Sequence, residues 1–266
     1  MYVSRTRALP AAFIFPLMLA GAAGCDIASA DLRHKETAEW RKTFTLAAGG
    51  RVEIGNVNGR IEVEPGTGNT VEIVAEKSAR GATPEAAREA LKRLEIRDET
   101  SSGSIKIETR HQRSGGLFER GGAEVRYLVR LPAAADGRFT TVNGGVQISR
   151  LNGRVEAETT NGGIVARDIG GELRASTTNG GIDVELVRVA DGGAKLECVN
   201  GGIKLRLPED AKASISADVT NGGISTTGLS LETTESTRRH IEARLNGGGP
   251  LIRIQGTNGG IRLGPR

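Results

Sequence analysis

The sequence predicts an all-β protein whose chain winds into a single-stranded β-solenoid with coils of 18 to 21 residues. Three observations lead to this fold class. Asn-Gly pairs recur at a regular spacing, apolar residues follow each pair in a two-residue step, and aromatic residues make up only 3% of the 266 residues. A stacked array has a narrow interior that aliphatic side chains can fill, so it does not need the large rings on which thick cores rely.

The repeat is clearest from residue 141 onward. Asn143, Asn152 and Asn161 are nine residues apart, Gly170 takes the next position, and Asn179 follows after another nine. Two kinds of corner alternate, a Thr-x-Asn-Gly-Gly type and a looser Leu-Asn-Gly type, so the full repeat has 18 residues and two copies stretch it to 21. An internal period of this kind is typical of stacked arrays.

Each nine-residue unit predicts a short strand with one buried face. Apolar residues lie three and five positions after the asparagine, as at Ile164 and Ala166. This two-residue step indicates a strand. The next inward position is often the eighth after the asparagine, which places three residues inside: Leu151, Ile169 and Val199.

A meander of β-hairpins is the rival architecture, because Asn-Gly is also a strong hairpin signal. A straight hairpin strand would keep the third, fifth and seventh positions inward, whereas a buried eighth position requires the chain to bend. We therefore favour coils made of short strands and bends. Asn and Gly suit such corners because both tolerate positive φ, and stacked asparagines are expected to hydrogen-bond along the array.

Charged residues on the outward positions support this register. If coils stack, residues 18 or 21 apart become neighbours about 4.8 Å apart. Opposite charges then adjoin in three columns: Arg167, Glu185 and Arg206; Glu156 and Arg174; Asp183 and Lys204.

The N-terminal third predicts strands around another Asn-Gly pair at 58–59, and one short helix near residues 84–94. Thr83 is its expected cap and Pro84 its first residue. The inner stripe of this helix is expected to be Ala87, Ala90, Leu91 and Leu94. The segment 226–245 departs from the repeat and predicts a protruding hairpin or loop. We expect one solenoid domain over residues 44–266, preceded by a tether over 26–43.

The first residues predict an export signal. Arg5 and Arg7 precede an apolar run over residues 11–23, which is shorter than a membrane span requires and fits the apolar region of a secretory signal. We favour a lipoprotein signal over residues 1–25, in which Cys25 follows Ala-Ala-Gly and is lipidated. The alternative is ordinary cleavage after Ala30, which would leave a soluble protein. Cys198 is then the one remaining thiol, expected to be a small half-buried filler.

The repeats resemble a known bacterial family. Thr-x-Asn-Gly-Gly-Ile and Leu-Asn-Gly-Arg-Val units, the early Asn58-Gly59-Arg60-Ile61 unit and the Thr257-Asn258-Gly259-Gly260-Ile261 ending are similar to the β-strand-repeat family known as putative adhesins, over roughly residues 44–264. The resemblance implies a β-solenoid exported to the cell envelope. It implies no reaction and carries over no catalytic residues.

Composition and motifs argue against several kinds of chemistry. Basic and acidic residues nearly balance, with a net charge of +4, so excess positive charge does not predict nucleic-acid binding. The glycine-rich units lack the third glycine and the aspartate of the calcium-binding nonapeptide. His34, His111 and His240 are too scattered for a zinc site. We therefore expect no metal, cofactor or catalytic residue.

The sequence favours a non-enzymatic envelope protein that acts as an adhesin-like binding or scaffold element. Its partner would be an envelope protein or a polysaccharide, with a membrane contact through the lipid anchor. Two irregular segments are the candidate contact loops: Leu117 and Phe118 in one, and Arg238, Arg239 and His240 in the other. Two alternatives remain: an envelope sensor working with a membrane partner, and a glycan-acting enzyme using a carboxylate pair such as Glu156 with Glu158 or Asp183 with Glu185.

Overall fold

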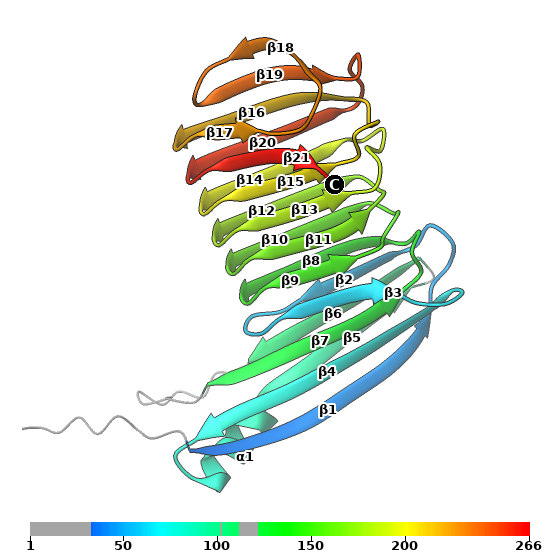
Figure 1. Ribbon diagram of the computed structural model, residues 1–266. Coiled ribbons are helices and arrows are strands. Elements are labelled where there is room, and N and C mark those ends of the chain that lie inside the picture. Colours follow the sequence, from blue (N-terminus) through cyan, green and yellow to red (C-terminus); the bar gives the residue numbers. More distant parts are fainter. Residues whose placement is uncertain (1–32, 102, 112–121) are drawn as a thin grey trace, which may run out of the picture. The chain divides into compact units, whose positions relative to one another are not determined.

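The computed structural model describes residues 33–101, 103–111 and 122–266, and over these residues the protein is an all-β solenoid with one helix (Figure 1). The strands form two sheets. We call the ten-stranded sheet, in the order β1-β4-β7-β3-β9-β11-β13-β15-β21-β17, sheet A. The eleven-stranded sheet, in the order β18-β19-β16-β20-β14-β12-β10-β8-β2-β6-β5, is sheet B.

Each coil contributes one strand to sheet B and the next strand to sheet A. The pairs are β2 (Arg51–Gly55) and β3 (Ile61–Pro65), β6 (Ser104–His111) and β7 (Ala123–Leu131), β8 (Asp136–Asn143) and β9 (Val146–Ser149), β10 (Val155–Asn161) and β11 (Ile164–Ile169), β12 (Leu173–Asn179) and β13 (Ile182–Leu186), β14 (Ala194–Asn200) and β15 (Ile203–Leu207), β16 (Ala213–Asn221) and β17 (Ile224–Thr226), and β20 (Leu251–Asn258) and β21 (Ile261–Pro265). Equivalent strands of stacked coils pair in parallel.

Antiparallel strands cover the outer coils. At one end β4 (Thr70–Gly81) pairs with β7, β1 (His34–Thr45) pairs with β4, and β5 (Leu94–Ser101) pairs with β6. At the other end β19 (His240–Leu245) pairs with β16 and β18 (Leu231–Ser236) pairs with β19. These pairings occupy backbone groups that a bare terminal coil would expose.

The predicted register is confirmed except at the end of β11, where it shifts between Ala166 and Ile169. Asn161 pairs with Asn143 on one side and Asn179 on the other, so equivalent positions stack on each other. The charge columns also form, with Glu156 opposite Arg174, Asp183 opposite Lys204 and Glu185 opposite Arg206. Arg167 lies 3.8 Å from Glu185.

The coils do not all stack in the order in which they follow one another along the chain. The prediction from the sequence that each coil lies on the preceding one is therefore wrong. The last coil, β20–β21, lies between β14–β15 and β16–β17, and the first coil, β2–β3, lies between β6–β7 and β8–β9. Figure 1 shows β20 and β21 inside the stack, below β16 and β17. The pattern could not reveal this order because every coil carries the same corner.

The two strand types explain the broken parity of the repeat. In sheet A, a residue with positive φ precedes each buried eighth position: Arg150 at 54° before Leu151, and Asp168 at 54° before Ile169. In sheet B the strands stay straight, and Val199 is 42% exposed while the preceding Cys198 is buried. The prediction for Val199 is therefore wrong, because this strand keeps the seventh position inward.

Asparagine side chains form a continuous ladder along the Asn-Gly corners. Within the described residues, six Nδ2-to-Oδ1 hydrogen bonds of 2.8–2.9 Å join seven amides in the order Asn58, Asn143, Asn161, Asn179, Asn200, Asn258 and Asn221. Beside it, the hydroxyls of Thr141, Thr159 and Thr177 donate to glycine carbonyls of the neighbouring coil at 2.8–3.1 Å. The Cys198 thiol takes the same place, 3.2 Å from the Gly180 carbonyl oxygen, and burial raises its pKa.

The first glycine of each corner lies against the backbone of the neighbouring coil. A Cβ atom on Gly162 would lie 2.0 Å from the Gly144 carbonyl oxygen, and one on Gly180 would lie 2.0 Å from that of Gly162. Real Cβ atoms do not approach carbonyl oxygens so closely. Glycine is therefore required here by the spacing of the coils.

Aliphatic side chains fill the core between the sheets. Among the described residues, Tyr127 on β7 and Phe139 on β8 are the largest fully buried side chains. The Tyr127 hydroxyl is 2.7 Å from the Thr109 hydroxyl, and burial raises the pKa of Tyr127 to about 12.

Three boundaries differ from the sequence-based expectations. The helix α1 (Pro84–Lys92) has Thr83 as its cap as predicted, but Leu94 already belongs to β5. Residues 34–43, which we expected in the tether, form most of β1, because alternating side chains such as Trp40 pack on the core. The expected hairpin within 226–245 exists as β18–β19, but it packs on β16 instead of protruding.

We expect Gly162→Ala to lower the free energy of unfolding by about 3 kcal/mol or more, because the added methyl group must separate two coils. Gly163→Ala is the matched control, since its Cβ would lie 3.3 Å from the nearest atom, the Gly181 carbonyl oxygen, and we expect a loss of about 1 kcal/mol. Urea unfolding of both variants measures the difference. Equal losses would contradict the requirement for close approach.

Candidate functional site

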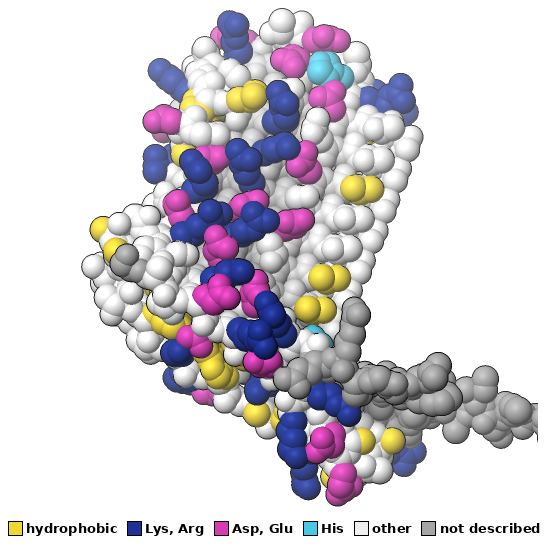
Figure 2. Space-filling model, turned by 180° about the vertical axis from the view of Figure 1, so that it is seen from behind, with side chains coloured by type: hydrophobic (Ala, Val, Ile, Leu, Met, Phe, Trp, Pro, Cys, Tyr) yellow, Lys and Arg dark blue, Asp and Glu magenta, His cyan; other side chains and the backbone are white. Residues whose placement is uncertain are grey.

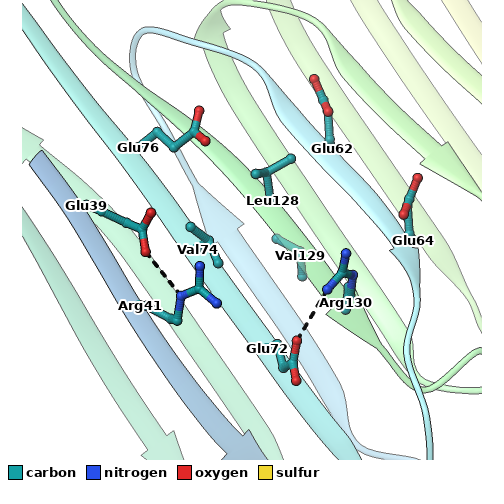
Figure 3. Close-up of a pocket in the computed structure, with 10 residues that line it drawn as sticks. All are labelled: Glu39, Arg41, Glu62, Glu64, Glu72, Val74, Glu76, Leu128, Val129 and Arg130. Carbon is teal, nitrogen blue, oxygen red and sulfur yellow. Dashed lines mark hydrogen bonds and ion pairs between the residues drawn. The ribbon is translucent and has the colours of Figure 1, made fainter. Parts of the chain in front are cut away.

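A shallow basin of about 230 Å³ lies on the outer face of sheet A, where the antiparallel strands join the parallel stack (Figure 3). Its residues come from β1, β4, β7 and β3. We call this depression the acidic basin. Its lining is Glu39, Arg41, Glu62, Glu64, Glu72, Val74, Glu76, Leu128, Val129 and Arg130.

Two aliphatic side chains form the floor of the acidic basin. Val74 on β4 lies opposite Leu128 on β7, and Leu128 lies opposite Glu62 on β3. Both aliphatic side chains sit at outward positions, because Ile73 and Val129 on the same strands face the core. Outward positions on a solvated sheet face are usually polar, so this adjacent pair is an exception that creates an apolar patch.

Charged side chains surround this floor. Arg41 donates to Glu39 at 3.1 Å, and Arg130 lies 3.6 Å from Glu72, as Figure 3 shows. Beyond the lining, Arg126 bonds to both carboxylate oxygens of Glu62 at 2.9–3.0 Å.

The residues that line the acidic basin carry more negative than positive charge, and Arg126 beside them pairs with Glu62 at 2.9 Å and with Glu76 at 3.7 Å. Five glutamates and two arginines line the basin. Within the part of the chain that the structure describes, Glu64 makes no ion pair, and it lies opposite Arg130 in the strand register, beside it in Figure 3. The basin therefore combines an apolar floor with carboxylates that a cationic partner could reach.

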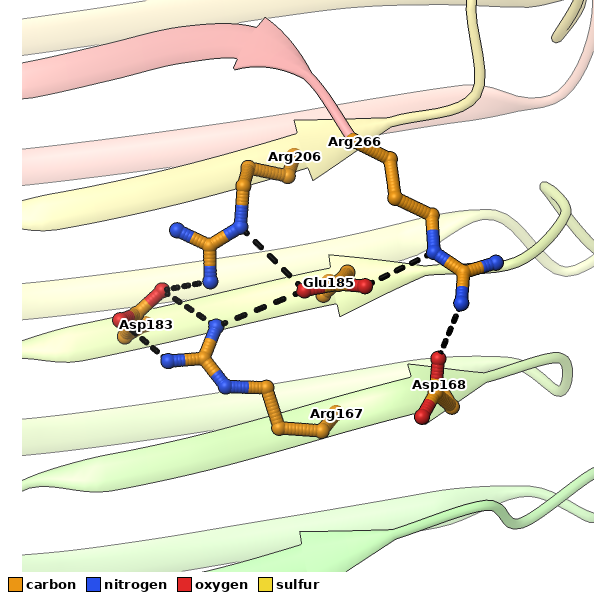
Figure 4. A network of polar contacts seen from close by, with 6 residues as sticks. All are labelled: Arg167, Asp168, Asp183, Glu185, Arg206 and Arg266. Carbon is orange, nitrogen blue, oxygen red and sulfur yellow. Dashed lines mark hydrogen bonds and ion pairs between the residues drawn. The ribbon is translucent and has the colours of Figure 1, made fainter.

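The carboxylates considered for glycan chemistry lie in a closed ion-pair network farther along sheet A (Figure 4). Arg167 binds Asp183 at 2.7 Å and Arg206 binds it at 3.0 Å. Arg206 and Arg266 hold Glu185 at 3.3 and 2.7 Å, and Arg266 also contacts Asp168. Asp183 and Glu185 thus fasten neighbouring coils together and anchor the last residue of the chain.

Sheet B presents alternating charges on its outer face, which Figure 2 shows as neighbouring basic and acidic side chains along the stack. Glu53, Arg138, Glu156 and Arg174 follow one another on adjacent strands. Arg138 lies 3.1 Å from Glu156. Glu156 and Glu158, the other candidate carboxylate pair, therefore take part in ion pairs with Arg138, a role that exposed pairs fill with small gains in stability.

The structure places one predicted contact segment at the end of the stack. Arg238 and Arg239 form the turn between β18 and β19, and their carbonyls accept hydrogen bonds from Ile224 N and Val219 N at 3.0 and 2.9 Å. His240 follows, with Nδ1 2.6 Å from an Asp218 carboxylate oxygen. This hydrogen bond raises the pKa of His240.

The other predicted site residues, Cys25, Leu117 and Phe118, lie outside the described residues. Over the described ranges, no group of three or more His, Cys, Asp or Glu side chains is arranged to hold a metal ion. In the same ranges, no helix has the length and apolar character needed to cross a membrane.

The region that contains the Asn-Gly repeat matches a known protein family. The family described as Toastrack DUF4097, a domain of unknown function, matches residues 49–263, which is most of the sequence. This protein belongs to the Toastrack DUF4097 family. The match confirms the family resemblance and the solenoid fold inferred from the Asn-Gly repeat.

Several solved structures are similar to this Toastrack protein. A putative cell adhesion protein from Clostridium sporogenes is 10% identical with a TM-score of 0.46, and the alignment covers 87% of this chain and all of that one. A putative adhesin from Bacteroides fragilis is 9% identical with a TM-score of 0.33, covering 85% and 97%. A putative lipid binding protein from Parabacteroides distasonis is 9% identical with a TM-score of 0.29, covering 87% and 97%. No curated protein matches the chain.

Sequence reasoning did not find the acidic basin. The sequence did contain a signal, because the alternation of apolar and charged residues is interrupted on both strands. Val74 is an apolar residue between Glu72 and Glu76, and Leu128 is an apolar residue between Arg126 and Arg130. Reading this signal requires knowing that β4 pairs with β7, and that pairing is not encoded in the repeat.

We expect the terminal hairpin of this Toastrack protein to be more stable at low pH than at high pH. The folded state raises the pKa of His240 above its unfolded value of about 6.5, so the bond to Asp218 stabilises the fold fully below that pH and its contribution is lost as pH rises through the higher folded value. Asp218→Asn should remove this component from the melting temperature measured against pH.

Glu232→Gln is the matched control, because Glu232 lies on the same hairpin and pairs with Arg244 in the strand register. The control should keep the pH dependence of the wild type. An NMR titration of His240 with no upward shift in pKa would contradict the assignment.

Proposed function

We propose that this Toastrack protein is a non-enzymatic binding or scaffold element of the bacterial cell envelope, and that the acidic basin is its partner-contact surface. The observation that carries the proposal is the apolar pair Val74 and Leu128 on the outer face of the sheet, in a depression whose lining holds five glutamates and two arginines. Rigid strands hold such a pair in place without an ordering cost on binding.

The chemistry of the acidic basin favours a protein segment with basic and aliphatic side chains. The aliphatic side chains would cover the floor, where burial of apolar surface supplies most of the affinity. The basic side chains would approach Glu64, the lining carboxylate that makes no ion pair within the described residues. Complementary charges of this kind mainly set partner choice and the rate of association.

The stack supports a scaffold role by fixing the distance between its ends. Backbone pairing, the asparagine ladder and the ion-pair network of Figure 4 connect neighbouring coils by independent contacts. A partner bound at the acidic basin is thereby held at a constant distance from the opposite end of the solenoid. Such rigidity suits a spacer or platform more than a hinged domain.

The N-terminal signal supports location in the envelope. We propose that the signal is cleaved immediately before Cys25 and that lipidated Cys25 becomes the N-terminus, so that the chain is held at a membrane surface. The apolar run over residues 11–23 and the small residues before Cys25 support this step. Cleavage after Ala30 would give a soluble exported protein instead.

A photo-reactive benzoylphenylalanine placed at Leu128 should cross-link to a defined envelope protein in intact cells, because its ring would lie on the basin floor. The matched control carries the same residue at Val165, a partly exposed position on sheet A outside the acidic basin. We expect an adduct from position 128 and none of the same mass from position 165.

Charge reversal tests the chemistry of the same contact. Glu64→Lys in the Leu128 cross-linking background should lower the adduct yield about threefold or more, since it places a positive charge beside the expected basic segment. Identical adducts from both positions, or a polysaccharide adduct in place of a protein, would contradict the proposed partner class.

Labelling with radioactive palmitate tests the anchor. The wild-type protein should incorporate label and sediment with membranes, whereas Cys25→Ser should remain unlabelled. Cys198→Ser is the matched control and should be labelled like the wild type. An unlabelled wild-type protein recovered in the soluble exported fraction would show that the signal is removed by the alternative cleavage.

A further inference from the structure

The last Asn-Gly corner of the stack differs from all the inner ones because no further coil covers it. At the inner corners the glycine N–H donates to the asparagine carbonyl of the next coil, as Gly201 N does to Asn258 O and Gly259 N to Asn221 O, both at 2.9 Å. The corner at Asn221 and Gly222 ends this series. Among the described residues, the Gly222 N–H has no hydrogen-bond partner.

Two arginines extend over this open corner. The turn carrying Arg238 and Arg239 folds back on it, and together they enclose an open depression lined by Thr220, Asn221, Gly222, Thr237, Arg238 and Arg239. Arg239 Nη1 lies 3.4 Å from the Thr220 carbonyl oxygen. Arg238 Nε lies 3.8 Å from the position of a Cβ on Gly223.

The nearby carboxylates are engaged elsewhere. His240 lies between Asp218, 2.6 Å from its Nδ1, and Glu235, 3.8 Å from its Nε2. Within the described part of the chain neither Arg238 nor Arg239 forms an ion pair with a carboxylate, unlike Arg167 and Arg206 in the sheet A network. Two guanidinium groups and a backbone N–H are therefore available at one corner.

We propose that this corner is a binding site for a phosphate group. Arginine presents a planar set of donors that matches phosphate oxygens, and a free backbone N–H adds a third donor. The Asn221 amide donates to Asn258, and its own Oδ1 accepts no bond from the described residues, so it can accept from a hydroxyl. The ligand class is thus a phosphate ester with a neighbouring hydroxyl, as in glycerol phosphate or a phosphoglycerol lipid headgroup.

This site is independent of the acidic basin and of the proposed protein partner. It lies at the opposite end of the strand order of sheet A, beside β17, whereas the basin lies over β1, β4, β7 and β3. A negative result at one of these two sites therefore says nothing about binding at the other.

Calorimetry of the purified protein with sn-glycerol 3-phosphate tests the soluble form of the ligand, and flotation with phosphatidylglycerol–phosphatidylcholine vesicles tests the lipid form, with vesicles of phosphatidylcholine alone as the blank. We expect the protein to bind sn-glycerol 3-phosphate, the vesicles that contain phosphatidylglycerol, or both. Arg238→Gln with Arg239→Gln should weaken binding about tenfold or more, because charged hydrogen bonds are lost. The backbone carbonyls of this turn still accept the hydrogen bonds that join it to the stack, and the side-chain contact that is lost, Arg239 to the Thr220 carbonyl, is long and exposed, so the melting temperature should change little.

Arg253→Gln with Arg262→Gln is the control of equal charge, since both arginines are exposed on the adjacent coil outside the depression. It should bind like the wild type. Arg238→Lys with Arg239→Lys keeps the charge without the planar donors and should also bind more weakly. The proposal is overturned if the wild type binds neither probe, if the control weakens as much as the glutamine variant, or if the lysine variant binds like the wild type.

Discussion

The close approach of corner glycines in successive coils is the constraint on which the structure depends. The Gly144 carbonyl oxygen occupies the place of a Cβ on Gly162, and the same contact recurs between Gly180 and Gly201. Coils at this spacing can pair their strands, join their asparagine amides and let buried threonine hydroxyls reach the next carbonyl. A larger residue at the corner would separate the coils and weaken all three sets of hydrogen bonds together.

The two ends of the stack differ from its regular middle in ways that reduce the number of unpaired backbone groups. A uniform array of parallel strands would expose unpaired backbone groups at both ends, and these promote association with other chains. This protein inserts its first and last coils between two others and pairs antiparallel strands with β7, β6 and β16, while β17 stays at the edge of sheet A. The C-terminal Arg266 is then held against the outer face of sheet A by Glu185 and by the Leu207 carbonyl.

The same departures from the repeat create the surfaces that could bind partners. The acidic basin forms where antiparallel β4 and β7 replace regular coils, and Val74 and Leu128 meet only through that pairing. The arginine turn covers an Asn-Gly corner only because β18 and β19 fold back on β16. In the regular middle, outward charges such as Arg167 and Asp183 pair with each other and hold neighbouring coils together.

The fold class, the coil length and the register could be predicted from the residue pattern alone, because the Asn-Gly corners and the apolar steps such as Ile164 and Ala166 repeat wherever a coil turns. The sequence also indicated Arg238 and Arg239 as an irregular segment. Three features could not be predicted from that pattern: the order of the coils, the burial of Cys198 in place of Val199, and the pairing of Val74 with Leu128. The repeat pattern is local, so it predicts the structure of each coil. Which coils lie side by side depends on the path of the connecting segments. Because the corners are alike, they do not favour one neighbouring coil over another.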